Sequence, residues 1–241
     1  MRLYAGTTRD FVADATRNNI ARRLESAFVE HFRHRPSPAE VRSWEESLAR
    51  LGLVVSSAKL TDHGIFLEYQ LPQNSRRIDA LITGVDNDQR ENAVIVELKQ
   101  WQESEASDAD AMVTTWLGGQ LRDTLHPSVQ AQGYRDYLAD MHSAFHEEPD
   151  PILLSACAYL HNYRASLDDP IRAPKFQDSV SRAPLYDATQ GAELEDFLVA
   201  HLSRGHGIPV LQRIEESKLR PSKKLLEHIS AVVDGEPRFV L

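Results

Sequence analysis

Two short apolar segments that carry ionisable residues constrain the fold of this chain more than any other feature. They are residues 76–84 (RRIDALITG) and 92–101 (NAVIVELKQW), and a polar loop joins them. Runs rich in Ile, Val and Leu on either side of a polar connection are typical of two antiparallel strands in a β-hairpin. We therefore expect a sheet built around this hairpin, with charged residues inside it.

Strand geometry brings the charged residues of the hairpin together. Glu97 and Lys99 lie two positions apart, so both should point to one face of the second strand. If Thr83 pairs with Ala93, an antiparallel register places Asp79 opposite Glu97, with about 4.5–5.5 Å between their Cβ atoms. Two carboxylates this close repel each other unless positive charge lies between them, and a divalent cation bound through oxygens would supply it. Lys99 would then orient or help to deprotonate an attacking water and offset charge on a phosphate.

Ordinary surface charge is the alternative interpretation of these residues. Acids and lysines are common on the exposed face of an antiparallel hairpin, where cross-strand pairs contribute only about 0.2–1 kcal/mol. Against this, both segments are almost continuously apolar, which indicates burial on both faces. Buried charges need partners or a metal. The pattern therefore favours a metal-dependent hydrolytic site over solvated charge.

The motifs of this chain resemble those of a known nuclease superfamily. R-I-D-A (77–80) followed by E-L-K (97–99) resembles the metal-binding signature of the PD-(D/E)XK phosphodiesterases. Gln130-Ala-Gln-Gly-Tyr134 resembles the Q-x-x-x-Y helix of the branch that contains RecB-type and Cas4-type nucleases. From about residue 20 to its end, the chain is also similar to the N-terminal nuclease region of prokaryotic nuclease–helicase fusions linked to defence against foreign DNA. The P-loop motif of the usual ATPase partner, G-x-x-x-x-G-K-[ST], does not occur in this chain.

This resemblance implies an α/β fold with an αβββαβ core, in which a mixed sheet is flanked by helices. The core would occupy residues 37–165, with an N-terminal helical extension over 1–36 and a C-terminal helical extension over 166–241 that could join an ATPase module. The implied activity is hydrolysis of nucleic-acid phosphodiester bonds with Mg²⁺ or Mn²⁺ as cofactor. DNA is favoured over RNA, and the biological setting would be prokaryotic antiviral defence.

The resemblance also assigns catalytic and metal-binding roles. The implied metal ligands are Asp79, Glu97 and the carbonyl of Leu98, and the supporting residues are Lys99, Gln130 and Tyr134. A further carboxylate could come from Glu40, because the first core helix of the superfamily often donates one, or from Glu68 in the preceding strand. Glu40 could equally serve only as a helix-capping residue, and Glu68 could be a partner of a nearby arginine.

Basic residues near this hairpin and at the end of the chain are candidate substrate contacts. Arg76 and Arg77 precede Asp79, and guanidinium groups suit bidentate phosphate contacts, although pairing with nearby acids is as reasonable. His161 should emerge at the carboxyl end of a central strand, where ligands often bind, unless it only hydrogen-bonds to a nearby loop. Lys223 and Lys224 form the best local candidate for a phosphate track, with solvated charge as the alternative.

Periodicity predicts the remaining elements. Helices are expected over 18–32, from a Ser37 cap to about residue 51, over 127–142 and over 191–204, and strands over 63–71 and 152–163. The last strand should run parallel to residues 92–101, because a helix connects the two. The first should alternate, with Phe66, Glu68 and Gln70 on one face and Leu67, Tyr69 and Leu71 on the other. Residues 102–128 are predicted to be irregular, either as a lid hinged at Gly118-Gly119 or as a surface excursion.

Composition limits the setting in which the chain can work. The 241 residues include one cysteine, Cys157, which excludes an intramolecular disulfide. No apolar run approaches the length of a membrane span, so a cytoplasmic protein without membrane contact is expected. A net charge of −9 counts against a surface that coats nucleic acid over its whole extent, but it leaves room for a local basic groove.

Other functions and partners remain open from the sequence. A catalytically inactive nucleic-acid-binding or assembly module could use the same fold, and a zinc-dependent hydrolase could use His142 and His146. Any ATPase or helicase action would need a fused domain or another polypeptide. The oligomeric state is not specified, and a homodimer is compatible with the sequence.

Overall fold

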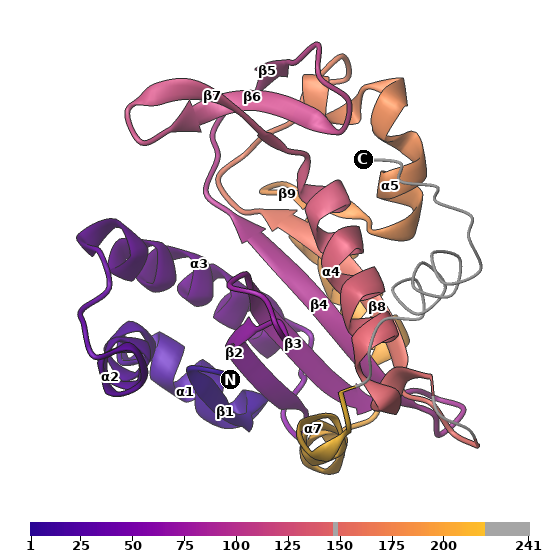
Figure 1. The fold of residues 1–241 in the computed structure, drawn as a ribbon. Helices are drawn as coiled ribbons and strands as arrows, with labels where there is room; N and C mark the ends of the chain where they lie inside the picture. The colour runs from indigo at the N-terminus through magenta and orange to yellow at the C-terminus, as the bar shows by residue number, and fades with distance from the viewer. Residues whose placement is uncertain (147–148, 220–241) are drawn as a thin grey trace, which may run out of the picture.

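The chain forms an α/β structure with a mixed sheet flanked by helices (Figure 1). The structure is a computed structural model and describes residues 1–146 and 149–219. Within these residues there is a six-stranded sheet in the order β1-β2-β3-β4-β8-β9 and a separate three-stranded sheet in the order β5-β6-β7. The large sheet carries the core, and the small sheet lies beyond the end of β4 (Figure 1).

The large sheet is antiparallel from β1 to β4 and parallel from β4 to β9. Its strands are β1 (Tyr4–Thr7), β2 (Gly64–Gln70), β3 (Arg77–Val85), β4 (Glu91–Lys99), β8 (Leu153–Leu160) and β9 (Leu185–Asp187). Thr83 pairs with Ala93, so the register predicted for the hairpin is confirmed. The parallel pairing predicted between the second hairpin strand and the strand after the connecting helix is also confirmed, since Val96 pairs with Cys157 in parallel.

The helices predicted over 18–32, 127–142 and 191–204 begin and end close to those positions, whereas helices over 8–16 and 177–182 were not predicted. The described residues contain seven α-helices in all. They are α1 (Thr8–Thr16), α2 (Ile20–Phe32), α3 (Pro38–Ser57), α4 (Pro127–Met141), α5 (Gln177–Arg182), α6 (Gly191–His201) and α7 (Gly207–Glu216), with single 3₁₀ turns at Ser143–Phe145, Pro170–Arg172 and Pro174–Phe176. Ser37 caps α3 as predicted, because its hydroxyl accepts a hydrogen bond from the Glu40 N–H at 3.1 Å. The helix continues to Ser57 rather than ending near residue 51, because Val54 and Val55 extend its buried face.

Both faces of the central strands are buried, as their continuous apolar pattern predicted. Val94 and Val96 pack into a core with α1, α2, α3 and α6, whereas Ala93 and Ile95 pack into a second core with α4 and α7. The helices therefore form one layer on each side of the sheet (Figure 1). Any charged side chain in the middle of β4 must be desolvated, which makes its partners decisive.

The segment predicted to be irregular is instead a small antiparallel sheet, so that prediction is wrong. It contains β5 (Glu105–Ala106), β6 (Met112–Leu117) and β7 (Gln120–Leu125). Gly118 and Gly119, proposed as a hinge, form the two-residue turn between β6 and β7 with φ values of 60° and 86°. Two consecutive glycines suit this turn because both positions need positive φ. The hairpin escaped prediction because β7 is largely exposed and polar.

Residues 1–36 and 166–219 contribute strands as well as helices, and residues 220–241 of the expected C-terminal extension lie outside the described residues. Residues 4–7, which show no strong sequence pattern, form β1 and pair with β2 at one edge of the large sheet. β9 pairs with β8 at the other edge. The expected helical extensions therefore complete the sheet that carries the central hairpin.

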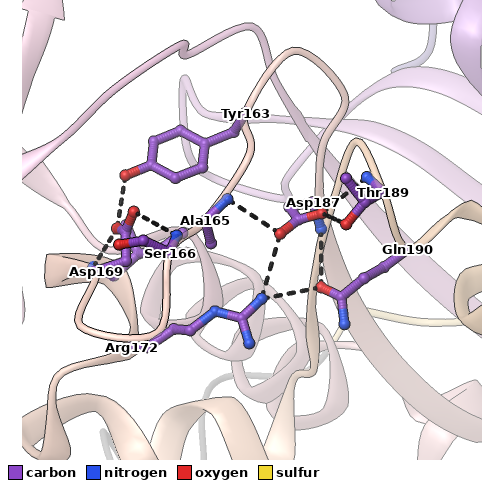
Figure 2. A network of polar contacts seen from close by, with 9 residues as sticks. Tyr163, Ala165, Ser166, Asp169, Arg172, Asp187, Thr189 and Gln190 are labelled. Carbon is purple, nitrogen blue, oxygen red and sulfur yellow. Dashed lines mark hydrogen bonds and ion pairs between the residues drawn. The ribbon is translucent and has the colours of Figure 1, made fainter.

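A buried aspartate organises the loops at the carboxyl ends of β8 and β9. Asp187 accepts hydrogen bonds from the main-chain N–H groups of Ala165 at 3.1 Å and Thr189 at 2.8 Å, and from the Thr189 hydroxyl at 2.6 Å. Arg172 lies 3.2 Å from the same carboxylate (Figure 2). Burial would raise the pKa of Asp187, but the hydrogen bonds from Thr189 and Ala165 and the charge of Arg172 together hold it below its ordinary value.

We expect Asp187→Asn to reduce the free energy of unfolding at pH 7 by about 1.5–3 kcal/mol. The carboxylate now accepts hydrogen bonds from several N–H groups, and the NH₂ group of the amide could not accept them. A carboxyl whose pKa is depressed by folding stabilises the protein above its unfolded pKa and loses that contribution as the pH falls. The difference between the two proteins should therefore shrink in acid. Urea denaturation at pH 7 and pH 3 measures it, with the exposed Asp178→Asn as the control. Equal losses in both variants would contradict the prediction.

Candidate functional site

The two acids of the hairpin lie side by side where β3 and β4 stop pairing. The main-chain ladder between these strands extends to the Ala80–Val96 pair. Beyond this pair, the Leu98 N–H donates to the carboxylate of Asp79 at 2.7 Å. A side chain thus accepts a hydrogen bond at the end of the ladder, which holds the Asp79 carboxylate next to Glu97 on β4.

Glu97 has one oxygen fully engaged and one oxygen free. The residue is 2% exposed. Its Oε1 accepts hydrogen bonds from Lys99 Nζ at 2.8 Å and from Gln130 Nε2 at 2.7 Å. Its Oε2 is buried and has no hydrogen-bond partner within the described part of the chain. A buried carboxylate oxygen without a donor is energetically unfavourable unless a cation or water completes it.

Gln130 connects both charged residues of β4 to helix α4. Its Oε1 accepts from Lys99 Nζ at 3.0 Å, and its Nε2 donates to the hydroxyl of Tyr134 at 2.9 Å as well as to Glu97. Gln130 and Tyr134 are one helical turn apart on the face of α4 that packs on the sheet. The structure therefore brings together the four side chains Glu97, Lys99, Gln130 and Tyr134, which the motifs had selected.

The charges of the site are strongly coupled. Burial raises the pKa of the Asp79 carboxyl well above its ordinary range, and the negative charges of Glu97 and Glu68 raise it further. Burial would lower the pKa of Lys99, but the carboxylates of Glu97 and Asp79 outweigh it and raise that pKa. Lys99 Nζ donates hydrogen bonds to Glu97 and to Gln130, and this geometry suits the orientation of a water.

A second network lies beside the first, around Arg77. The indole N–H of Trp44 donates to Glu68 at 2.8 Å, and the Arg77 guanidinium contacts Glu68 at 3.2 Å and also pairs with Glu40. Glu68 is therefore a partner of an arginine, which was one of the two roles predicted for it. Glu40 pairs with the same arginine and also lies in the capped first turn of α3. Burial raises the pKa of Glu68 to about 7, although Arg77 and Trp44 oppose this shift.

The main chain at Glu68 departs from a regular strand. Its φ is 51°, a left-handed value that is unfavourable for a residue with a side chain. The predicted alternation of β2 is therefore wrong: Phe66 and Tyr69, assigned to opposite faces, stack on the same side with ring centroids 5.4 Å apart, while Leu67 packs into the other core. Strained backbone of this kind concentrates at functional sites. Here it lies directly opposite the position of Asp79 on β3.

The two networks carry excess negative charge. Four carboxylates face two cationic side chains, so the formal charge is −2 when all six groups are ionised. The carboxylates belong to Asp79, Glu97, Glu68 and Glu40, and the cations are Lys99 and Arg77. A divalent cation would balance this charge. Among the described residues, no group of three or more His, Cys, Asp or Glu side chains could hold a metal ion. The donors fit Mg²⁺ or Mn²⁺ held by Asp79 and Glu97 with water, because Mg²⁺ commonly uses one or two carboxylates and keeps several waters.

The predicted substrate-binding residues are placed differently from one another. Arg76 is exposed near the site, whereas Arg77 is engaged by two acids. His161 is buried, and its ring nitrogens contact Ser47 at 3.0 Å and Asn162 at 3.2 Å. Burial lowers the pKa of His161, so its ring is neutral at pH 7 and serves a structural contact. Lys223 and Lys224 lie outside the described residues.

A cleft that the sequence did not reveal opens next to Lys99. It has a volume of about 650 Å³ and is lined by residues 100–103, which follow β4, and by residues 115–118 of the small sheet. The Trp101 ring forms part of it, and the ring centroid lies 5.8 Å from Lys99 Nζ. The cleft depends on the β6–β7 hairpin, so it could not be found while residues 102–128 were expected to be irregular.

No protein-family model, curated protein or solved structure matches this chain. The resemblance of its motifs to nuclease motifs therefore stays a prediction, and the contacts described above carry the functional inference. In the part of the chain that the structure describes, no helix has both the length and the apolar character that a membrane span requires.

Proposed function

We propose that this chain is a metal-dependent nuclease of the PD-(D/E)XK type that hydrolyses nucleic-acid phosphodiester bonds. The observation that carries the proposal is the state of Glu97. One carboxylate oxygen is held by Lys99 and Gln130, and the other is buried beside Asp79 with no hydrogen-bond partner among the residues that the structure describes. The order α3-β2-β3-β4-α4-β8, interrupted only by the small sheet and a 3₁₀ turn, supports the αβββαβ arrangement expected for such a core.

Asp79 and Glu97 would hold the cation, with the Leu98 carbonyl as the third protein ligand. When bound, Mg²⁺ or Mn²⁺ would supply Lewis acidity toward the phosphate and lower the pKa of a bound water. The Leu98 N–H keeps the Asp79 carboxylate in place, and Gln130 keeps the Glu97 carboxylate in place. These contacts preorganise the two acids, which lessens the reorganisation needed when substrate arrives.

Lys99 would position the attacking water and offset the charge that grows on the phosphate. Its ammonium is held between Glu97 and Gln130, so its direction is set before substrate binds. Phosphoryl transfer depends mainly on positioning and charge stabilisation, and this small set of residues can provide both. Tyr134 supports the set through its hydrogen bond to Gln130.

The preference for DNA, the role in antiviral defence and the partnership with a P-loop ATPase rest on the motif resemblance. They remain part of the proposal. A homodimer also remains compatible with it.

Cleavage assays test the proposed function directly. Single-stranded DNA, duplex DNA and RNA are incubated with the protein in Mg²⁺, in Mn²⁺ and in EDTA. We expect cutting in the presence of either metal and none in EDTA, with DNA cut faster than RNA. Absence of cutting on every substrate by a folded protein would instead favour an inactive nucleic-acid-binding or assembly module.

A further inference from the structure

The small sheet presents an exposed aromatic side chain beside an exposed aliphatic one. Trp116 on β6 is 59% exposed and Leu121 on β7 is 47% exposed, and the two residues are direct cross-strand partners. Trp44 and Trp101, by contrast, are 4% and 8% exposed. Trp116 and Leu121 together form an exposed apolar surface on the hairpin.

The hairpin is held firmly in place below this surface. The buried Thr115 hydroxyl donates to the carbonyl of Glu103 at 2.7 Å, and Ser104 shares a hydrogen bond of 2.9 Å with the Tyr163 hydroxyl. Lys175 donates to two carbonyls of the segment before β6. The tight turn at residues 118–119 fixes the register. Trp116 is thus a positioned surface group at the tip of a braced hairpin.

Trp116 also borders the cleft that opens beyond the end of β4. Trp116 lines the cleft on the hairpin side, and Trp101 lines it on the side of β4, where its ring is 5.8 Å from the Lys99 ammonium. The small sheet lies beyond the end of β4 (Figure 1). The cleft therefore has Trp116 on one side and, on the other, the ring that lies next to the Lys99 ammonium.

The chemistry of this surface fits a nucleobase better than a phosphate backbone. Residues 102–125, which form the small sheet and its connections, contain five acids and one arginine, and Lys175 donates to two carbonyls of this segment. The acids are Glu103, Glu105, Asp108, Asp110 and Asp123, and the arginine is Arg122. Such a surface repels a line of phosphates. Aromatic stacking needs no charge, and every base offers a flat face for it once the base is unpaired. In a duplex the neighbouring base pairs cover these faces.

We propose that Trp116, flanked by Leu121, stacks on an unpaired base of a single-stranded nucleic acid whose cleaved bond lies at Asp79, Glu97 and Lys99. This inference rests on the proposed nuclease function and specifies its substrate as a single strand or a frayed end. Trp116 would position the strand and take no part in the chemical step.

Binding measured in EDTA tests the platform independently of cleavage. Short fluorescent oligothymidylate and oligouridylate are titrated with the protein, and anisotropy is recorded for wild type, Trp116→Ala and Trp116→Phe. We expect Trp116→Ala to bind roughly tenfold more weakly or worse, and Trp116→Phe to recover most of the loss, because Phe retains an aromatic face. Both oligonucleotides should also quench the tryptophan emission of the wild type.

Matched controls separate stacking from a general loss of apolar surface and from self-association. Leu53 on α3 is 64% exposed, so Leu53→Ser is an equivalent loss of exposed apolar surface and should leave binding unchanged. Equal binding by wild type and Trp116→Ala overturns the platform. So does equal affinity for a blunt duplex and a single strand. A change of elution volume in Trp116→Ala without a change in oligonucleotide binding would overturn it in favour of an interface between copies.

The same variants distinguish failure of this inference from failure of the nuclease proposal. If oligonucleotide binding depends on Trp116 but no metal supports cutting, the platform stands and the nuclease proposal fails. If metal-dependent cutting of single strands is unaffected by Trp116→Ala, the nuclease proposal stands and the platform fails.

Discussion

Lys99→Gln is expected to slow metal-dependent cleavage by roughly 10²- to 10³-fold, the range seen when one preorganised donor is removed from a charge-stabilising site. The amide can still donate to Glu97, so the fold should survive, but it carries no positive charge toward the phosphate. Single-turnover cleavage of the preferred substrate measures the loss. Circular dichroism and thermal unfolding on the same samples show whether the structure is intact.

The matched control for this variant is Lys59→Gln, because Lys59 is an exposed lysine on the segment that follows α3. It should cut at the wild-type rate. Comparable rates for Lys99→Gln and wild type would remove Lys99 from the mechanism.

Asp79→Asn is expected to abolish cleavage and, at the same time, to stabilise the metal-free protein at pH 8. The pKa of Asp79 is raised in the folded state by burial and by Glu97 and Glu68, so ionisation of this carboxyl opposes folding. An amide removes the charge and can still accept from the Leu98 N–H. The free energy of unfolding in EDTA should therefore be higher for the variant than for wild type.

The pH dependence of this gain has a definite sign. A carboxyl with a raised folded pKa binds its proton more tightly in the folded state, so wild-type stability declines as the pH rises from the unfolded value, about 3.9, through the folded one. The advantage of Asp79→Asn should therefore be present at pH 8 and vanish near pH 3. Urea denaturation at the two pH values measures it, with the exposed Asp88→Asn as the control.

Added Mg²⁺ should reverse the order of stability. A ligand that binds only the folded state stabilises it by RT ln(1 + [L]/Kd), about 2.7 kcal/mol at a hundredfold excess over Kd. Wild type should gain this increment, and Asp79→Asn should gain much less, because it has lost one of the two carboxylates. A melting temperature that responds equally to Mg²⁺ in both proteins would argue against a cation at this site.

Local sequence patterns were sufficient for the elements whose residues interact with near neighbours. The continuous apolar runs on either side of a polar loop predicted the β3–β4 hairpin, its Thr83–Ala93 register and burial on both faces. Ser37 predicted the start of α3. These features follow from side-chain alternation and capping, which act over a few residues and are therefore visible in the sequence.

Packing between distant segments settled the rest. The contacts of Arg77 with Glu40 and of Gln130 with Glu97 form because α3 and α4 lie against the sheet. The two residues of each pair are more than thirty positions apart along the chain. The left-handed backbone of Glu68 and the small sheet that carries Trp116 arise in the same way. The side chains of a candidate site can be selected from motifs, but competition among all available partners in the folded chain decides which contacts they make.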